Sequence, residues 1–443
     1  MRPLENLTLE AIIKLCGEKF KQLPDERSDY KYALHDTLMS GLAMMFFQHP
    51  SLLSFQRAME KKRQRSNLET IFGVSRAPSD TQMREILDGT QIESLRRLLP
   101  ELFERMRRSG WTVQFRTEVP MSDGEVEKYY TMPLDGTDYF HSTKIQCPHC
   151  LRRSDAAGQE HYRHTVLSAS LVKAGKHEVL PLDFEEVRNE DGQEKQDCEV
   201  NAAKRLIPRV RREHPQLKLI ALGDDLYAHE PFIALLSECR MRYVLVAKES
   251  SHRELFEWVE DLDRLGESER GSWSEGPVAK RREFEYRIVR GAPLCGSSER
   301  LVNFVEVWER DRQGKRRYHN SWVTDLEVSA QNVAVIVRIG RSRWKIENEQ
   351  FNVQKNHGYE LEHNYGHGKK TLAMVFYTLN LLAYVMHTVL ELGDRLYQRC
   401  RAERPRYELW ERLRGWFDRF LIGSWENLLR LQLEELEPGE AGP

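Results

Sequence analysis

Between residues 128 and 247, the apolar pattern changes repeatedly between the two-residue period of a strand and the 3.6-residue period of a helix. The predicted elements are, in order, strands at 128–139, 164–172 and 179–185, a helix at 197–213, a strand at 217–222, a helix at 230–239 and a strand at 243–247. Three successive strands predict a meander, and the alternation after them predicts an α/β core. Pro133 in the first strand and Pro208 in the first helix run against this pattern.

Three short strings place an acid at the end of one strand, at the end of another strand and at the start of a helix. They are Leu134-Asp135-Gly136-Thr137, Gly223-Asp224-Asp225-Leu226-Tyr227 and Arg343-Trp344-Lys345-Ile346-Glu347. Because two divalent ions need hard oxygen ligands from separate parts of a chain, Asp135, Asp224 and Glu347 are the candidate metal ligands and catalytic residues. Aspartate beside glycine is also ordinary turn chemistry. The neighbouring acids that could replace the three are Asp138, Asp225 and Glu349.

In this order the strings resemble those of DDE-class insertion-sequence transposases, specifically the insertion-sequence-4-like group, over residues 111–392. The helix signature of that group is Y-x2-R-x3-E-x6-K. Arg343 and Glu347 match it, whereas Gly340 stands at the tyrosine position and Lys355 comes one residue late. The resemblance implies an RNase-H-like core, which is a mixed sheet flanked by helices, with a β-rich insertion. The predicted order of strands and helices is the order expected of that fold.

The resemblance implies a transposase that binds the terminal inverted repeats of an insertion sequence and cleaves and joins DNA strands. Two Mg²⁺ or Mn²⁺ ions would serve in-line phosphoryl transfer, first to water and then to the freed 3′-hydroxyl, while Arg343 and Lys355 contact phosphates. The implied partners are double-stranded DNA, both repeat and target, and a second copy of the chain in a homodimer. The alternatives are a metal-dependent nuclease of the same fold and a DNA-binding relative without chemistry.

These interpretations divide the 443 residues into five segments, because a chain of this length exceeds one compact core. We predict a helical DNA-binding domain at 1–110, the first part of the catalytic core at 111–249, a β-rich insertion at 250–325, the second part of the core at 326–392 and a C-terminal helical region at 393–443.

Two further features are candidates for DNA contact. The densest basic segment of the N-terminal region carries Arg57, Lys61, Lys62 and Arg63. A solvated helix face is the alternative explanation for that segment. Related transposases stack a flipped base on an aromatic residue of the insertion, and Trp322 precedes Glu347 at a suitable distance. A tryptophan packed in the core is the commoner role for such a residue.

Cysteine and histidine spacing predicts one zinc site. Cys147 and Cys150 form a Cys-x2-Cys turn, and His161 and His164 follow after a polar loop. Such spacing can close a tetrahedral structural zinc site, and the alternative is two reduced thiols beside unrelated histidines. His367, in a glycine-flanked turn after the Glu347 helix, has no assigned role.

The sequence favours a cytoplasmic protein, and the resemblance implies one of bacterial type that is nucleoid-associated when it binds DNA. Lys and Arg number 67 against 69 Asp and Glu, so any DNA contact must come from local basic patches. The N-terminus lacks the apolar run of a secretory signal, and the seven scattered cysteines predict reduced thiols. The apolar stretch 374–392 contains Asn380 and His387, which favour a buried helix over a membrane span.

Overall fold

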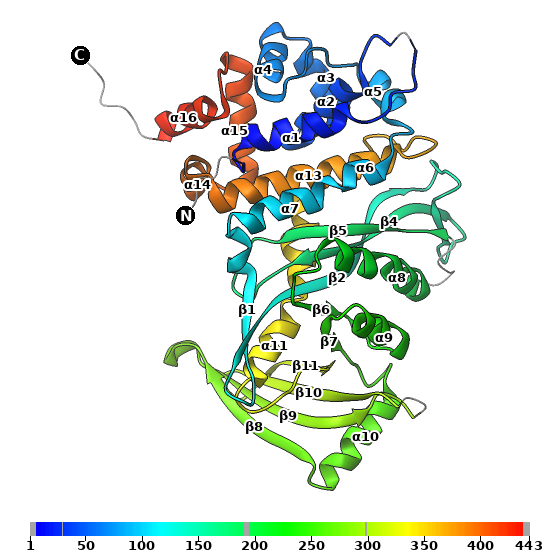
Figure 1. Ribbon diagram of the computed structural model, residues 1–443, viewed down its shortest axis with the longest axis vertical. Coiled ribbons are helices and arrows are strands. Elements are labelled where there is room, and N and C mark those ends of the chain that lie inside the picture. The colour runs from blue at the N-terminus through cyan, green and yellow to red at the C-terminus, as the bar shows by residue number, and fades with distance from the viewer. Residues whose placement is uncertain (1–5, 29, 190–194, 297–298, 437–443) are drawn as a thin grey trace, which may run out of the picture. The chain divides into compact units, whose positions relative to one another are not determined.

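The computed structural model describes residues 6–28, 30–189, 195–296 and 299–436, which form two compact units (Figure 1). The helical unit contains the described residues of Met1–Val113, Thr137–Val166 and Asn348–Pro443. The sheet unit contains those of Gln114–Gly136 and Leu167–Glu347. Strands β2 (Val126–Ser142) and β4 (Glu160–Leu171) run through both units.

The chain is a mixed α/β protein with a large mixed sheet flanked by helices, which confirms the predicted class. Within the sheet unit the strand order is β4, β2, β6, β7, β11, β10, β9, β8, with β1 paired to β2 and β5 paired to β4. The pairs β2–β6 and β6–β7 are parallel, whereas β7–β11 and the pairs of β8 to β11 are antiparallel. The remaining core strands are β1 (Arg116–Pro120), β5 (Leu180–Val187), β6 (Leu219–Gly223) and β7 (Arg242–Val246).

The elements β2, β4, β5, α8, β6, α9 and β7 follow one another in the predicted order. All five residues of β6 are buried, as expected for a parallel strand between two neighbours. Both prolines are accommodated: Pro133 pairs with Leu222 in the β2–β6 ladder, and Pro208 lies inside α8. The helices of this region are α8 (Lys195–Glu213), the short 3-10 helix η3 (Asp225–Tyr227) and α9 (Glu230–Glu238).

The predicted β-rich stretch forms an antiparallel set of strands that continues the core sheet, because β11 pairs with β7. Its inward-facing residues share one apolar core with β6 and β7, and Trp322 belongs to that core. The elements are α10 (Arg253–Arg264), β8 (Ser268–Glu275), the 3-10 helix η4 (Val278–Lys280), β9 (Arg282–Pro293), β10 (Leu301–Arg310), β11 (Arg316–Thr324) and α11 (Val333–Arg341).

The segment that carries Glu347 is a π-helical turn, η5 (Ile346–Phe351), followed by the short helix α12 (Asn352–Asn356). The sequence predicted a helix here without indicating its type. A π-helical turn contains about one residue more than an α-helical turn.

The helical unit is built around α13 (Leu372–Gly393), which lies beside α1 and α6 in Figure 1 and also contacts α2, α5 and α14. Every regular element among the described residues 6–110 is a helix, as predicted. Ser79 caps α5 with its hydroxyl oxygen, which accepts the N–H of Gln82 at 3.4 Å. The other elements are α1 (Leu9–Lys21), α2 (Leu34–Phe46), α3 (Leu52–Met59), α4 (Lys62–Phe72), α5 (Asp80–Leu87), α6 (Ile92–Arg96), α7 (Leu98–Arg108), the 3-10 helix η1 (Trp111–Phe115) at the unit boundary, β3 (Leu151–Ser154), α14 (Arg395–Ala402), α15 (Arg406–Arg419) and α16 (Trp425–Leu436).

Within the part of the chain that the structure describes, α13 is the one helix whose length and composition would suffice to cross a membrane. In its most apolar window, 94% of the residues are buried inside the protein, as predicted for a core helix. Its polar residues have internal partners: the amide of Asn380 donates to the carbonyl of Tyr359 at 2.7 Å, and His387 Nδ1 lies 2.6 Å from the Tyr359 hydroxyl.

Candidate functional sites

Two neighbouring parallel strands carry the predicted aspartates. Asp224 directly follows β6, as predicted, whereas Asp135 lies inside β2, which continues to Ser142, so the prediction that it ends a strand is wrong. In the β2–β6 ladder Pro133 pairs with Leu222, so the register extended by two residues sets Asp135 opposite Asp224. Adjacent strands lie about 4.8 Å apart, which brings the two backbones within reach of one shared ligand. The Asp224 carboxylate caps η3 by accepting the N–H of Leu226 at 3.1 Å.

Arg343 joins Asp135 to Glu347. Its Nη1 lies 3.2 Å from Oδ2 of Asp135 and 2.8 Å from Oε1 of Glu347, and only 8% of the Arg343 side chain is exposed. A buried guanidinium stabilises carboxylates because their charges are poorly solvated. Asp135 and Glu347 therefore both contact Arg343 in the sheet unit. The resemblance in the sequence implied a phosphate contact for this arginine.

The electrostatics of the acid cluster show an excess of negative charge. Burial raises the pKa of Asp135 to about 8, the nearby carboxylates of Glu347 and Glu199 also raise it, and Arg343 opposes them. Burial likewise raises the pKa of Asp224, again against the charge of Arg343. One guanidinium thus faces several carboxylates, an arrangement that bound cations would neutralise.

Glu199 of α8 belongs to this cluster, although its sequence context gave no indication of it. The side chain is buried, with 4% of the residue exposed. A Cβ added at Gly136 would lie 2.7 Å from its Oε1, so the carboxylate packs directly against β2 at the residue after Asp135. It also contributes, after burial, to raising the pKa of Tyr227 well above the usual value.

Two of the neighbouring acids have other partners. Asp225 accepts hydrogen bonds from Lys248 at 2.6 Å and from Ser251 at 3.0 Å. Asp138 lies in the helical unit, where it accepts a hydrogen bond from Thr165. These contacts favour Asp135 and Asp224 as the acids that face Arg343. Glu349 belongs to the helical unit, and its carbonyl accepts a hydrogen bond from Tyr384 at 2.9 Å.

Trp322 is a core residue, which corrects the prediction that it stacks on a base. It has 0% exposure in β11 and packs on Gly340 of α11, where an added Cβ would lie 2.6 Å from Nε1 of the indole. The same contact leaves no room for a side chain at position 340. Trp344, next to Arg343, is 50% exposed and holds its ring 4.5 Å from the Arg343 guanidinium.

The predicted DNA-binding cations of the helical unit are surface residues, and some have partners. Those with exposed side chains are Arg57, Lys61, Lys62 and Arg63. Lys61 forms an ion pair with Asp418 at 2.7 Å, and Arg63 donates to the Asp418 carbonyl at 3.3 Å. Lys355 also lies in this unit and pairs with Glu362 at 2.8 Å.

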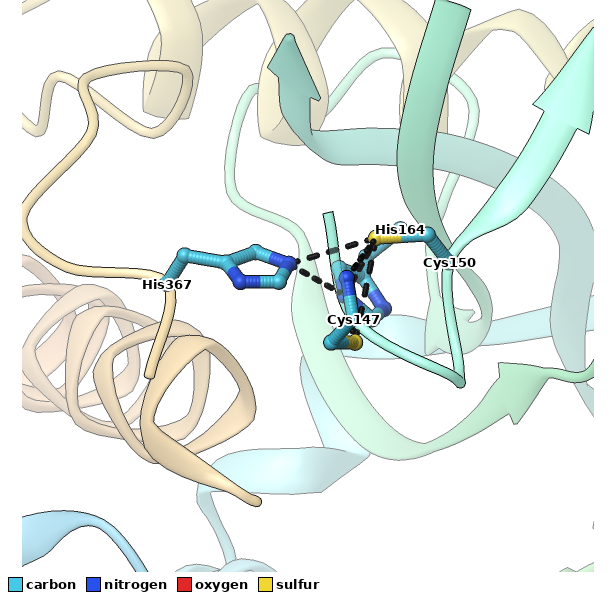
Figure 2. A group of neighbouring side chains, drawn as sticks. All are labelled: Cys147, Cys150, His164 and His367. Carbon is cyan, nitrogen blue, oxygen red and sulfur yellow. Dashed lines mark hydrogen bonds between the residues drawn. The ribbon is translucent and has the colours of Figure 1, made fainter. Parts of the chain in front are cut away.

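A second cluster, in the helical unit, consists of four buried side chains that could hold a metal ion: Cys147, Cys150, His164 and His367. Their ligand atoms all lie within 4.8 Å of one another. Figure 2 shows the ring of His367 reaching the other three from a separate loop, with its Nε2 facing Cys150 and His164. The predicted cysteines and His164 are therefore brought together, and the fourth member is His367.

His161 is not part of this cluster, which corrects its assignment as a zinc ligand. Its Nδ1 lies 2.8 Å from Nε2 of His141, and its Nε2 lies 3.2 Å from Oδ2 of Asp155. Alternate residues of a strand point to opposite faces, and residues 161 and 164 are separated by an odd number of positions. The turn that contains His367 could be seen in the sequence, but its contact with residues some 200 positions earlier could not.

Burial shifts the pKa values of two members of the cluster in opposite directions. Burial is the main cause that raises the pKa of the Cys150 thiol to about 11. Burial, followed by the neighbouring His164, lowers the pKa of His367 below its usual value, so the neutral imidazole that can bind a metal is favoured.

No family model matches this chain, and no curated protein sequence matches it.

Proposed function

We propose that this protein is a DDE-type DNA transposase whose catalytic acids are Asp135, Asp224 and Glu347. The observation that carries the proposal is the buried Arg343, which contacts Asp135 and Glu347 and whose charge also acts on Asp224. These interactions support a site shared by acids of β2, the end of β6 and a helical turn, as the chemistry requires. The resemblance in the sequence supplies the reaction class, and the element order supports an RNase-H-like core.

The donor set of the acid cluster fits Mg²⁺ or Mn²⁺, because it consists of carboxylate oxygens with more negative than positive charge. When bound, two such ions would polarise the scissile phosphate and activate the attacking oxygen. The softer thiolate and imidazole donors of the second cluster instead favour Zn²⁺.

In this proposal the residues of the chain position the reacting groups. Arg343 fixes the spacing of Asp135 and Glu347, since one of its nitrogens contacts both. Asp224 is held by the N–H of Leu226 at the end of β6, so its free oxygen lone pairs are aimed by the backbone. Pre-arranged charge of this kind needs no reorganisation during the reaction. Water and then a 3′-hydroxyl would be the successive nucleophiles.

The proposed partners are the terminal inverted repeats and target DNA, bound by a homodimer in the bacterial cytoplasm. Exposed Arg57, Lys62 and Arg63 in the helical unit support a contact with the phosphate backbone, for which exposed lysine and arginine are the usual donors.

Incubation with a supercoiled donor plasmid that carries the reading frame and its flanking DNA tests the proposal. The wild-type protein with Mg²⁺ should yield cleaved and joined products, and Asp135→Asn should yield neither while retaining DNA binding. Asp123→Asn is the matched control, because its exposed carboxylate bonds only a local N–H, that of Glu125 at 2.9 Å. Cleavage without joining would identify a nuclease. DNA binding by the wild type without any cleavage would identify a non-catalytic DNA-binding protein.

A further inference from the structure

We propose that Cys147, Cys150, His164 and His367 form a closed tetrahedral Zn²⁺ site whose role is to hold two distant segments of the helical unit together. The inference goes beyond the transposase proposal, since none of the four ligands belongs to the acid cluster. It can therefore stand or fall independently of any DNA chemistry.

Five of the six distances between ligand atoms are close to those of a zinc tetrahedron, and the sixth, from Cys147 Sγ to His367 Nε2, is within 4.8 Å. With Zn–S about 2.3 Å and Zn–N about 2.05 Å, the edges should be about 3.8 Å between sulfurs, about 3.6 Å between sulfur and nitrogen and about 3.3 Å between nitrogens. The two sulfurs of Cys147 and Cys150 are 3.8 Å apart. His164 Nε2 lies 3.5 Å from Cys147 Sγ and 3.4 Å from Cys150 Sγ. His367 Nε2 lies 3.2 Å from Cys150 Sγ and 3.1 Å from His164 Nε2.

The two imidazole nitrogens face each other, so both rings direct a nitrogen into the cluster. Nε2 of His367 contacts Nε2 of His164, although its other nitrogen, Nδ1, lies 3.0 Å from the carbonyl of Gly368. A proton on Nδ1 satisfies that carbonyl and leaves the Nε2 lone pair directed at the cluster. Orientation of a histidine ligand through its second nitrogen is the usual arrangement at protein metal sites.

The surroundings indicate a structural site with no open coordination position. All four residues are buried, and the rings of Tyr139 and Phe140 pack beside the histidines, with centroids 5.7 Å and 4.3 Å from His164 and His367 respectively. The backbone N–H of Cys147 donates to Cys150 Sγ at 3.3 Å, a contact that stabilises thiolate. Four protein ligands complete a tetrahedron, so no position is left for water or substrate.

The proposed ion would connect segments that the chain itself leaves far apart. His164 and His367 are separated by 203 residues. The loop of His367 is also anchored on its other side, because the Asp88 carboxylate accepts the N–H groups of Lys369, Lys370, Thr371 and Leu372. Removal of zinc should therefore loosen the helical unit along β4 and the entry to α13.

Metal analysis of the full-length protein, purified under reducing conditions, is the first test. About one zinc per chain is expected, and substitution with Co²⁺ should give the strong visible absorption of a tetrahedral thiolate site. Absence of zinc both as purified and after incubation with Zn²⁺ would overturn the inference.

Ligand identity is tested with a set of matched variants. His367→Ala should lose the zinc, His367→Cys should restore it as a three-thiolate site, and His161→Ala should retain it, because that neighbouring histidine lies outside the cluster. Recovery of zinc in His367→Cys is the decisive result, because a cysteine would not restore metal binding if His367 only filled space. Zinc loss from His161→Ala with retention in His367→Ala would show that the assignment is wrong.

Discussion

Gly340 lies directly beneath the indole of Trp322, so that a Cβ at position 340 would be 2.6 Å from Nε1 and 2.7 Å from Cε2 of the ring. Trp322 is fully buried and cannot swing away. Gly340→Ala should therefore destabilise the protein by about 1–3 kcal/mol through overpacking, despite the better helix propensity of alanine. Urea unfolding measures the change. Gly415→Ala is the control, because nothing lies within 4 Å of its added Cβ, and it should be neutral or slightly stabilising.

The buried Trp322 and the half-exposed Trp344 should contribute differently to stability. Trp322→Ala removes a fully buried ring and should cost about 3–5 kcal/mol of unfolding free energy. Trp344→Ala removes a half-exposed ring and should change stability by less than about 0.5 kcal/mol. Chemical denaturation of both variants checks this, and equal losses would contradict the assignment of Trp322 to the core.

Gly136→Ala should affect the acid cluster more than the fold. The added Cβ would meet the end of the Glu199 side chain, which can rotate, so the stability loss should stay below about 1.5 kcal/mol. The displaced carboxylate would disturb the acid cluster beside Asp135, and metal-dependent DNA cleavage should fall sharply. Glu199→Gln, which keeps the shape and removes the charge, should also lower cleavage. Full activity in both variants would exclude Glu199 from the site.

Asp88 should contribute stability that depends on pH. Partial burial raises the pKa of Asp88, but the four backbone N–H groups that it accepts outweigh this and hold it below the usual value. An acid whose pKa is lowered in the folded state stabilises the protein at pH values above its unfolded-state pKa of about 3.9. This contribution is lost as the pH falls through the folded-state pKa. Asp88→Ala should thus cost about 1.5–3 kcal/mol at pH 7.

The difference between wild type and Asp88→Ala should shrink as the pH falls below about 4, when measured by urea unfolding across pH. Asp123→Ala, which removes an exposed carboxylate with one local bond, is the control and should be nearly neutral at every pH. A difference that is independent of pH would show that charge is not involved.

Lys62 and Lys61 should differ in DNA binding because only Lys61 is paired, with Asp418 at 2.7 Å. Lys62→Ala should weaken binding at low salt and reduce the slope of log K against log salt by about 0.9, the loss of one phosphate contact. Asp418→Asn should have the opposite effect, since it releases Lys61. Fluorescence anisotropy over a range of NaCl concentrations measures both, and an unchanged slope for Lys62→Ala would exclude a phosphate contact.

Local patterns in the sequence determined the order of strands and helices from β2 to β7, the all-helical residues 6–110 and the Cys147–Cys150 turn. Periodicity and turn chemistry act between residues close in the chain, so they can be read without a structure. The position of Asp224 directly after β6 followed from the same patterns, whereas Asp135 lies inside β2.

The tertiary structure decided which distant side chains meet. It buried Trp322 against Gly340, set Glu199 beside Gly136, turned Arg343 onto two acids and placed His367 rather than His161 beside His164. Except for Arg343 with Glu347, which are one helical turn apart, these contacts join residues distant in the chain. They depend on how helices and strands pack rather than on local preference. No local pattern encodes them, because the free energy that selects them comes from burial and charge compensation across the assembled core.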